Sequence, residues 1–159
     1  PGEVLRRVNA LLIPESEAST FVTIFYGILN TRTGEVQYSN GGHNSPVLVR
    51  ATGEVEQLAM TDGFLVGKIE HQDYDAKKIQ LQTGDTIFLY TDGVTEAMDS
   101  DMNMFEDERL ALYLKKSNGS STRELARGSL ADLKAFTGSA PQSDDITVMI
   151  LRYLGRNLS

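Results

Sequence analysis

The sequence of 159 residues contains no cysteine. This absence excludes disulfide bonds, thiolate metal sites and cysteine nucleophiles, and it agrees with an expected location in the reducing cytoplasm. No run of residues is long or apolar enough to span a membrane.

Positive charge is also scarce, because 15 Lys and Arg stand against 22 Asp and Glu, a net charge of −7. We therefore expect neither nucleic acid nor anionic lipid as a partner. The excess of acid favours solubility, and part of it is available for metal binding.

Several motifs of well-known enzyme classes are missing. The chain has no Gly-x-x-x-x-Gly-Lys phosphate loop, no Gly-x-Ser-x-Gly elbow and no His-Glu-x-x-His zinc helix. Residues 99–103 begin like a calcium loop, but Met104 occupies the glycine position and Leu110 the position of the bidentate acid. Tyr90 stands where a haloacid-dehalogenase phosphatase needs its aspartate nucleophile. These chemistries are therefore excluded.

The hydrophobic pattern predicts one domain of α+β class over residues 1–159, with layered antiparallel strands and flanking helices. Residues 21–29 are apolar at both odd and even positions, and these positions face opposite sides of a strand. The pattern therefore predicts a central strand covered on both faces. Residues 121–124 form a capping box at the start of a helix whose inner face would be Ala126, Leu130 and Leu133. The predicted helices are 1–12, 106–116 and 121–136; the predicted strands are 21–29, 36–39, 46–50, 55–60, 73–81, 86–90 and 146–151; residues 15–20 are a predicted polar loop.

Two acidic segments are the most informative feature that the sequence contains. Residues 87–90 are typical of a buried strand, and Asp92 follows its end. Residues 146–151 are also typical of a buried strand, but here Asp144 and Asp145 come before it. If these strands are antiparallel neighbours, the acids meet at one sheet edge. Gathered carboxylates repel one another unless a cation lies between them, and Mg²⁺ or Mn²⁺ is the cation expected.

Four motifs follow one another along the chain: Asn40-Gly41-Gly42-His43-Asn44, Leu81-Gln82-Thr83-Gly84-Asp85, Leu89-Tyr90-Thr91-Asp92-Gly93-Val94-Thr95-Glu96-Ala97 and Asp144-Asp145-Ile146-Thr147. Their order resembles the SpoIIE/RsbU-type branch of the metal-dependent PPM (PP2C-like) serine/threonine phosphatases. The resemblance implies a PP2C-like β-sandwich flanked by helices. It also implies two-metal hydrolysis of phosphoserine or phosphothreonine on a regulatory protein of the anti-sigma-factor antagonist type.

Family domains begin further upstream, with a Gly-Asp-Phe-Tyr-Asp type segment whose aspartate bridges two metals. The sequence contains no such segment. We therefore expect the chain to be roughly the C-terminal two-thirds of a family domain, lacking its N-terminal strands, within a longer protein that carries an upstream sensor or regulatory domain. We expect this piece to be inactive by itself.

The resemblance assigns a role to several residues. Asp92 and Asp144 are the expected catalytic metal ligands, with Asp145 and the backbone of Gly93 as further candidates. His43 and Asn40 are expected at the edge of the active site, although His43 could equally be a turn residue and Asn40 is most simply one. Thr91 and Thr95 most simply hydrogen-bond the turn backbone. A non-catalytic module of the same fold that binds a phosphoprotein or regulator is the alternative function.

Overall fold

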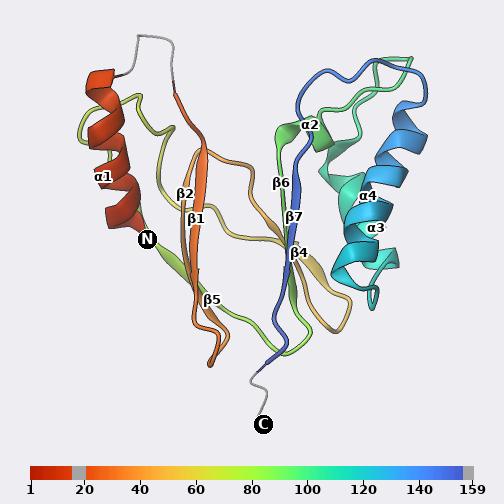
Figure 1. Ribbon diagram of the computed structural model, residues 1–159, viewed down its shortest axis with the longest axis horizontal. Coiled ribbons are helices and arrows are strands. Elements are labelled where there is room, and N and C mark those ends of the chain that lie inside the picture. The colour runs from red at the N-terminus through yellow and green to blue at the C-terminus, as the bar shows by residue number, and fades with distance from the viewer. Residues whose placement is uncertain (16–20, 156–159) are drawn as a thin grey trace. The chain divides into compact units, whose positions relative to one another are not determined.

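A computed structural model describes residues 1–15 and 21–155 (Figure 1). The chain divides into two compact units, each built around its own antiparallel sheet. The first unit is formed chiefly by residues 1–45 and 59–81, and the second by residues 46–58 and 82–154. No helix within the described ranges is long and apolar enough to cross a membrane. Helices beside antiparallel sheets confirm the predicted α+β class, whereas the single domain stays a prediction.

The first unit packs helix α1 against a three-stranded sheet. Helix α1 (Gly2–Leu12) continues into a short 3-10 helix (Ile13–Glu15), which confirms the helix predicted for residues 1–12. The sheet contains β1 (Ile24–Leu29), β2 (Glu35–Gly41) and β5 (Lys77–Gln80) in the order β1-β2-β5. The buried side chains of Leu5, Val66 and Tyr74 form the centre of this unit's core. The apolar stripe of α1 therefore covers the sheet as its spacing predicts.

The prediction that residues 21–29 form a central strand covered on both faces is wrong. Strand β1 pairs only with β2 in the described sheet and lies at its edge. Ile28 is 49% exposed, so apolar residues at both odd and even positions of a strand do not require that both of its faces are buried. Phe25 instead gains its contact across the strand pair, where its ring stacks on that of Tyr38. Of the predicted loop at 15–20, Glu15 ends the 3-10 helix and residues 16–20 lie outside the described ranges.

The second unit has a four-stranded sheet and three helices. Its strands β3 (Val47–Val49), β4 (Val55–Gln57), β6 (Thr86–Tyr90) and β7 (Val148–Arg152) lie in the order β4-β3-β6-β7. Helix α2 (Asp92–Thr95) follows β6 directly, and α3 (Glu106–Lys116) and α4 (Thr122–Thr137) lie beside the sheet (Figure 1). The core joins strand residues to leucines of both long helices: Val47, Val49, Phe88, Tyr90, Leu110, Leu114, Leu125 and Leu133.

Two details of the second unit correct the sequence prediction. The buried residues of α4 are Leu125, Ser129 and Leu133, whereas Leu130 is 45% exposed and Ala126 only partly buried. Ser129 tolerates burial because its hydroxyl donates to the Ala126 carbonyl at 3.0 Å, so a polar residue can occupy the inner face. Strand β7, predicted to be buried on both faces, lies at the sheet edge, and its Met149 is 60% exposed.

Candidate functional site

Strands β6 and β7 bring the two acidic segments to one end of the second sheet. The strands are antiparallel neighbours, with Tyr90 opposite Val148, as predicted. Asp92 lies just past the end of β6, and Asp144 and Asp145 lie just before β7. The backbones approach closely here, because a Cβ atom on Gly93 would lie 2.5 Å from the Asp145 carbonyl oxygen. A glycine is therefore required at the point where the two segments meet.

Thr91 ties the two segments together. Its hydroxyl donates to the Asp145 carbonyl at 2.8 Å and accepts from the Thr147 amide at 2.9 Å. The Thr91 amide also donates to the Thr147 carbonyl at 3.1 Å. Sequence reasoning expected Thr91 to bond the backbone of its own turn, and the structure shows instead a bridge between the acidic segments. Thr95 has the simpler local role, since its hydroxyl donates to the Asp92 carbonyl.

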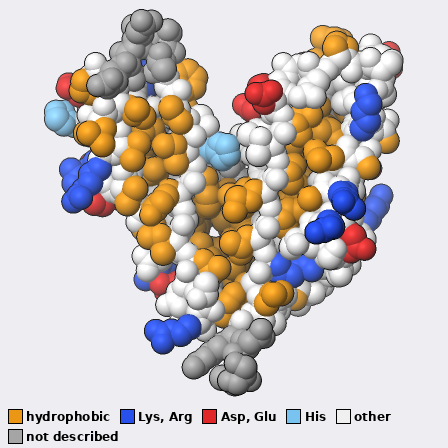
Figure 2. Space-filling view, in the orientation of Figure 1, with side chains coloured by type: hydrophobic (Ala, Val, Ile, Leu, Met, Phe, Trp, Pro, Cys, Tyr) orange, Lys and Arg blue, Asp and Glu red, His pale blue; other side chains and the backbone are white. Residues whose placement is uncertain are grey.

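The carboxylates at this end of the sheet are open to solvent. Asp92, Asp144 and Asp145 are all exposed, and acidic side chains are visible at the α2 end of the second unit (Figure 2). One oxygen of Asp92 accepts from the Gly93 amide at 3.0 Å, and one of Asp144 from the Asp145 amide at 2.6 Å. Among the described residues no Lys, Arg or His forms a salt bridge with these acids. Carboxylate oxygens are therefore available for a cation.

The donor set fits a hard divalent ion in part. Exposed carboxylates and backbone carbonyls are the ligand type that Mg²⁺ and Mn²⁺ prefer. Within residues 1–15 and 21–155, however, no three His, Asp or Glu side chains are placed to hold one ion together. The described residues thus supply two acidic segments to a cation, and the remaining ligands would be water or groups outside them.

Asn40 and His43 form a separate arrangement in the first unit. Asn40 is buried; its side chain accepts from the His43 amide and donates to the His43 carbonyl, both at 2.7 Å. The His43 ring lies 3.0 Å from the Thr23 hydroxyl through Nδ1. Asn40 therefore holds the glycine-containing turn through its side chain from a position within β2. The simpler hypothesis expected a turn residue with an unusual backbone angle, and Asn40 is not one. The predicted position of both residues at the active-site edge stays a prediction.

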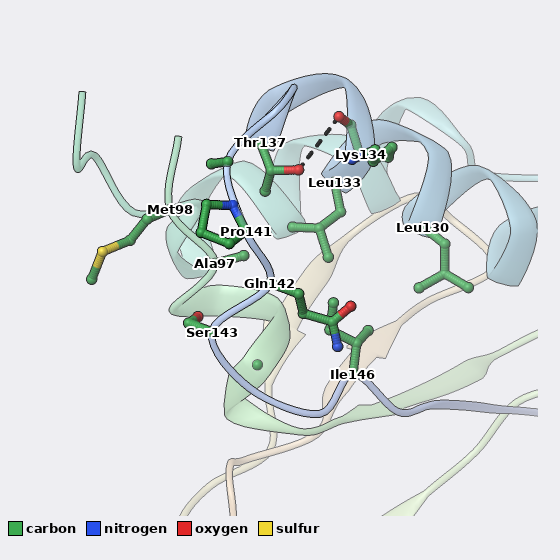
Figure 3. A pocket seen from close by; sticks show the side chains of 12 residues that line it. Ala97, Met98, Leu130, Leu133, Lys134, Thr137, Pro141, Gln142, Ser143 and Ile146 are labelled. Carbon is green, nitrogen blue, oxygen red and sulfur yellow. Dashed lines mark hydrogen bonds between the residues drawn. The ribbon is translucent and has the colours of Figure 1, made fainter. Parts of the chain in front are cut away.

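A cavity of about 230 Å³ lies in the second unit beside the acidic segments (Figure 3). Gly93 and Ser143 contribute to its wall, and side chains from α4 and the following segment form most of the remainder. Leu130, which the sequence assigned to the inner face of α4, lines this cavity instead. Sequence reasoning missed the cavity because its wall joins residues of three segments without a common periodicity.

Comparison with known proteins identifies the family. The model of the Stage II sporulation protein E (SpoIIE) family matches residues 1–154. The phosphoserine phosphatase RsbU of Bacillus subtilis (strain 168) is 27% identical over 155 residues, which cover 96% of this chain and 45% of RsbU. The chain therefore spans less than half the length of this relative.

Solved structures agree with that match. The RsbU and RsbW domains of Rv1364c from Mycobacterium tuberculosis superpose with a TM-score of 0.78 at 25% identity, covering 98% of this chain and 42% of that one. The SiaA-PP2C domain of Pseudomonas aeruginosa gives a TM-score of 0.83 at 22% identity, covering 96% of this chain and 61% of that one. The chain thus has the PP2C fold and belongs to the SpoIIE family.

Proposed function

We propose that this chain is part of the catalytic domain of a bacterial signalling phosphatase that acts in the cytoplasm. Its substrate would be phosphoserine or phosphothreonine on a regulatory protein of the anti-sigma-factor antagonist type. The observation that carries the proposal is the delivery of Asp92 and Asp144 to one end of an antiparallel strand pair. The name of RsbU, a phosphoserine phosphatase, supports the reaction class.

Asp92 and Asp144 would hold divalent ions at this edge, with Asp145 and the Gly93 backbone as further candidates. RsbX, which shares the fold, was solved in complex with magnesium, and the SpoIIE phosphatase domain of Bacillus subtilis was solved after presoaking with manganese. Two Mg²⁺ or Mn²⁺ ions would activate water and neutralise phosphoryl oxygens. The chain's own contribution is positional, because Thr91 fixes the two acidic segments relative to each other.

A non-catalytic phosphoprotein-binding module is the second candidate. One observation favours it: among the described residues, no three His, Asp or Glu side chains are placed to hold one metal ion. The two candidates differ in turnover, so activity measurements separate them.

The test uses the domain extended upstream in its native protein, assayed with p-nitrophenyl phosphate and a phosphoserine protein in Mn²⁺. We expect hydrolysis by the extended domain and little or none by the 159-residue chain. Asp92→Asn and Asp144→Asn should each lower kcat by orders of magnitude with an unchanged circular dichroism spectrum, because each removes a carboxylate that would hold an ion stabilising the transition state. Asp101→Asn, an exposed acid of the same unit, is the matched control. An extended domain that is inactive with every divalent ion, or unaffected by both substitutions, contradicts the enzyme hypothesis.

A further inference from the structure

The wall of the cavity beside the acidic segments combines apolar side chains with the polar side chains of Thr137, Gln142, Ser143 and Lys134. Leu130, Leu133 and Ile146 project toward it (Figure 3), and Ala97, Met98 and Pro141 also line it. Lys134 is the one charged residue of the wall, and its ammonium group donates to the Gly138 carbonyl at 2.8 Å. No carboxylate lines the cavity, although the whole chain is acidic. The side-chain amide of Gln142 donates to the Asp144 carbonyl at 2.7 Å, so this polar wall group already has a partner within the chain. The aliphatic side chains of the wall provide a surface on which an apolar group can pack.

The cavity begins one residue away from each acidic segment. Gly93, which lines it, directly follows Asp92, and Ser143, which also lines it, directly precedes Asp144. Adjacent Cα atoms are about 3.8 Å apart. A group bound between the acids and a group bound in the cavity are thus separated by a distance that a few residues of peptide can span.

The cavity is large enough for one side chain. Its volume is about 230 Å³, and a cavity of roughly 150 Å³ already accepts a molecule of the size of benzene. Leu130 remains 45% exposed at its wall. Covering this apolar surface with an aliphatic group would remove it from water, which is favourable.

We propose that this cavity binds an aliphatic side chain that lies two residues from the phosphoserine of the substrate protein. The proposal rests on the proposed function, because it takes the phosphate to bind at Asp92 and Asp144. In an extended peptide, residues two apart point to the same side and are about 6.6–6.8 Å apart. A phosphoserine directed at the acids therefore directs its second neighbour, on one side or the other, at the cavity. Leu130, Leu133 and Ile146 would then determine specificity.

The first experiment compares phosphoserine peptides on the extended domain with Mn²⁺. The peptides carry Leu or Gln two residues before or after the phosphoserine and are otherwise identical. We expect kcat/KM to be about tenfold higher for Leu than for Gln at one of these positions, the usual scale of discrimination by an apolar pocket. Ala140→Phe, which fills the cavity, and Leu130→Gln, at an exposed helix position, should both abolish the preference. Hydrolysis of p-nitrophenyl phosphate should stay within about twofold.

Ala135→Phe provides the matched control, because Ala135 is exposed on α4 and does not line the cavity. It should keep both the Leu preference and the basal rate. Equal rates for Leu and Gln peptides at both positions, in a domain that hydrolyses p-nitrophenyl phosphate, overturn the inference and leave the proposed function intact. A loss of p-nitrophenyl phosphate hydrolysis in Ala140→Phe equal to the loss for peptides also overturns it, since the cavity would then support the fold or hold another ligand.

A binding measurement decides the case in which the extended domain has no activity. Methyl NMR signals of Leu130 and Leu133 are followed in the extended domain while the Leu or Gln phosphopeptide is added with Mn²⁺. We expect these signals to shift with the Leu peptide, to shift less with the Gln peptide, and to remain unshifted in Ala140→Phe. Absence of any shift with the Leu peptide rejects the cavity as a subsite.

Discussion

Asp85 is 1% exposed in the turn before β6, and its carboxylate is fully hydrogen-bonded. It accepts from the amides of Gln82 and Ala51 at 2.9 and 2.8 Å and from the Arg50 guanidinium at 3.0 Å. Burial alone would raise the pKa of Asp85, but these donors outweigh burial and the pKa is lowered. This acid therefore stabilises the second unit, in contrast to the exposed acids at the sheet end.

Replacement of Asp85 by Asn should destabilise the chain in a manner that depends on pH. Breaking a buried ion pair costs about 3 kcal/mol, so we expect a loss of that order near neutral pH in urea unfolding. Because the folded-state pKa is lowered, the stabilisation is complete above the ordinary pKa of 3.8 and is lost as the pH falls through the folded-state value. The difference between the parent chain and Asp85→Asn should thus shrink below that pH.

Glu56 supplies the control for this prediction. It pairs with Arg50 at 3.0 Å, but its side chain is 56% exposed, so Glu56→Gln should cost less than about 1 kcal/mol. A difference between the parent chain and Asp85→Asn that is the same at low and neutral pH would show that the ionised carboxylate does not contribute.

At the scale of elements, α2 and the segment before β7 are held together by close approach. A Cβ atom on Gly93 would lie 2.5 Å from the Asp145 carbonyl oxygen, so Gly93→Ala must separate them. We expect a loss of about 1–3 kcal/mol in urea unfolding, the usual cost of overpacking. Hydrogen exchange of the Thr147 amide should also become faster, because this amide donates to Thr91 on the opposite segment.

Gly119→Ala distinguishes this effect from a general loss of stability. Nothing lies within 4 Å of the added Cβ, but Gly119 has a φ of +87°, so the substitution strains the backbone. It should lower stability without a local effect on the Thr147 amide. Unchanged exchange at Thr147 in Gly93→Ala would mean that the two segments do not depend on this contact.

The start of α4 offers a prediction that both sequence and structure support. The Ser121 hydroxyl accepts from the Glu124 amide at 3.2 Å, and the Glu124 carboxylate accepts from the Ser121 amide at 2.8 Å. Ser121→Ala should therefore cost about 1 kcal/mol in urea unfolding. Ser120→Ala, one residue before the cap, should cost less than half as much. Equal losses would indicate that the capping box contributes little.

Elements with local signals could be predicted, and tertiary placement could not. The capping box, the helix over 106–116 and the strand over 86–90 depend on short-range patterns, and the structure confirms all of them. The edge position of β1 depends on which strands pair, and this information is not contained in the apolar run itself. At the site, acids after one strand and before another predicted a shared sheet end. The Thr91 bridge depends on hydrogen-bond geometry that no spacing reveals.

At the scale of the whole molecule, the chain contains both acidic segments of one sheet and spans 45% of the length of RsbU. The described residues bring no third metal-binding side chain to these acids. Mg²⁺ keeps several waters and relies on further carboxylates or substrate phosphate when few protein ligands are present. The 159-residue chain should therefore bind metal much more weakly than the same domain extended upstream.

Calorimetry on the 159-residue chain should show only weak, roughly millimolar binding of Mg²⁺ or Mn²⁺. Asp92→Ala should abolish this binding, because it removes one of the two acidic segments from the site. Asp101→Ala should leave it unchanged, since Asp101 is an exposed acid elsewhere in the second unit. Tight binding that survives Asp92→Ala would place the ligands elsewhere in the chain. Weak binding lost only in Asp92→Ala would show that the edge formed by β6 and β7 binds the cation, with affinity limited by the small number of carboxylates.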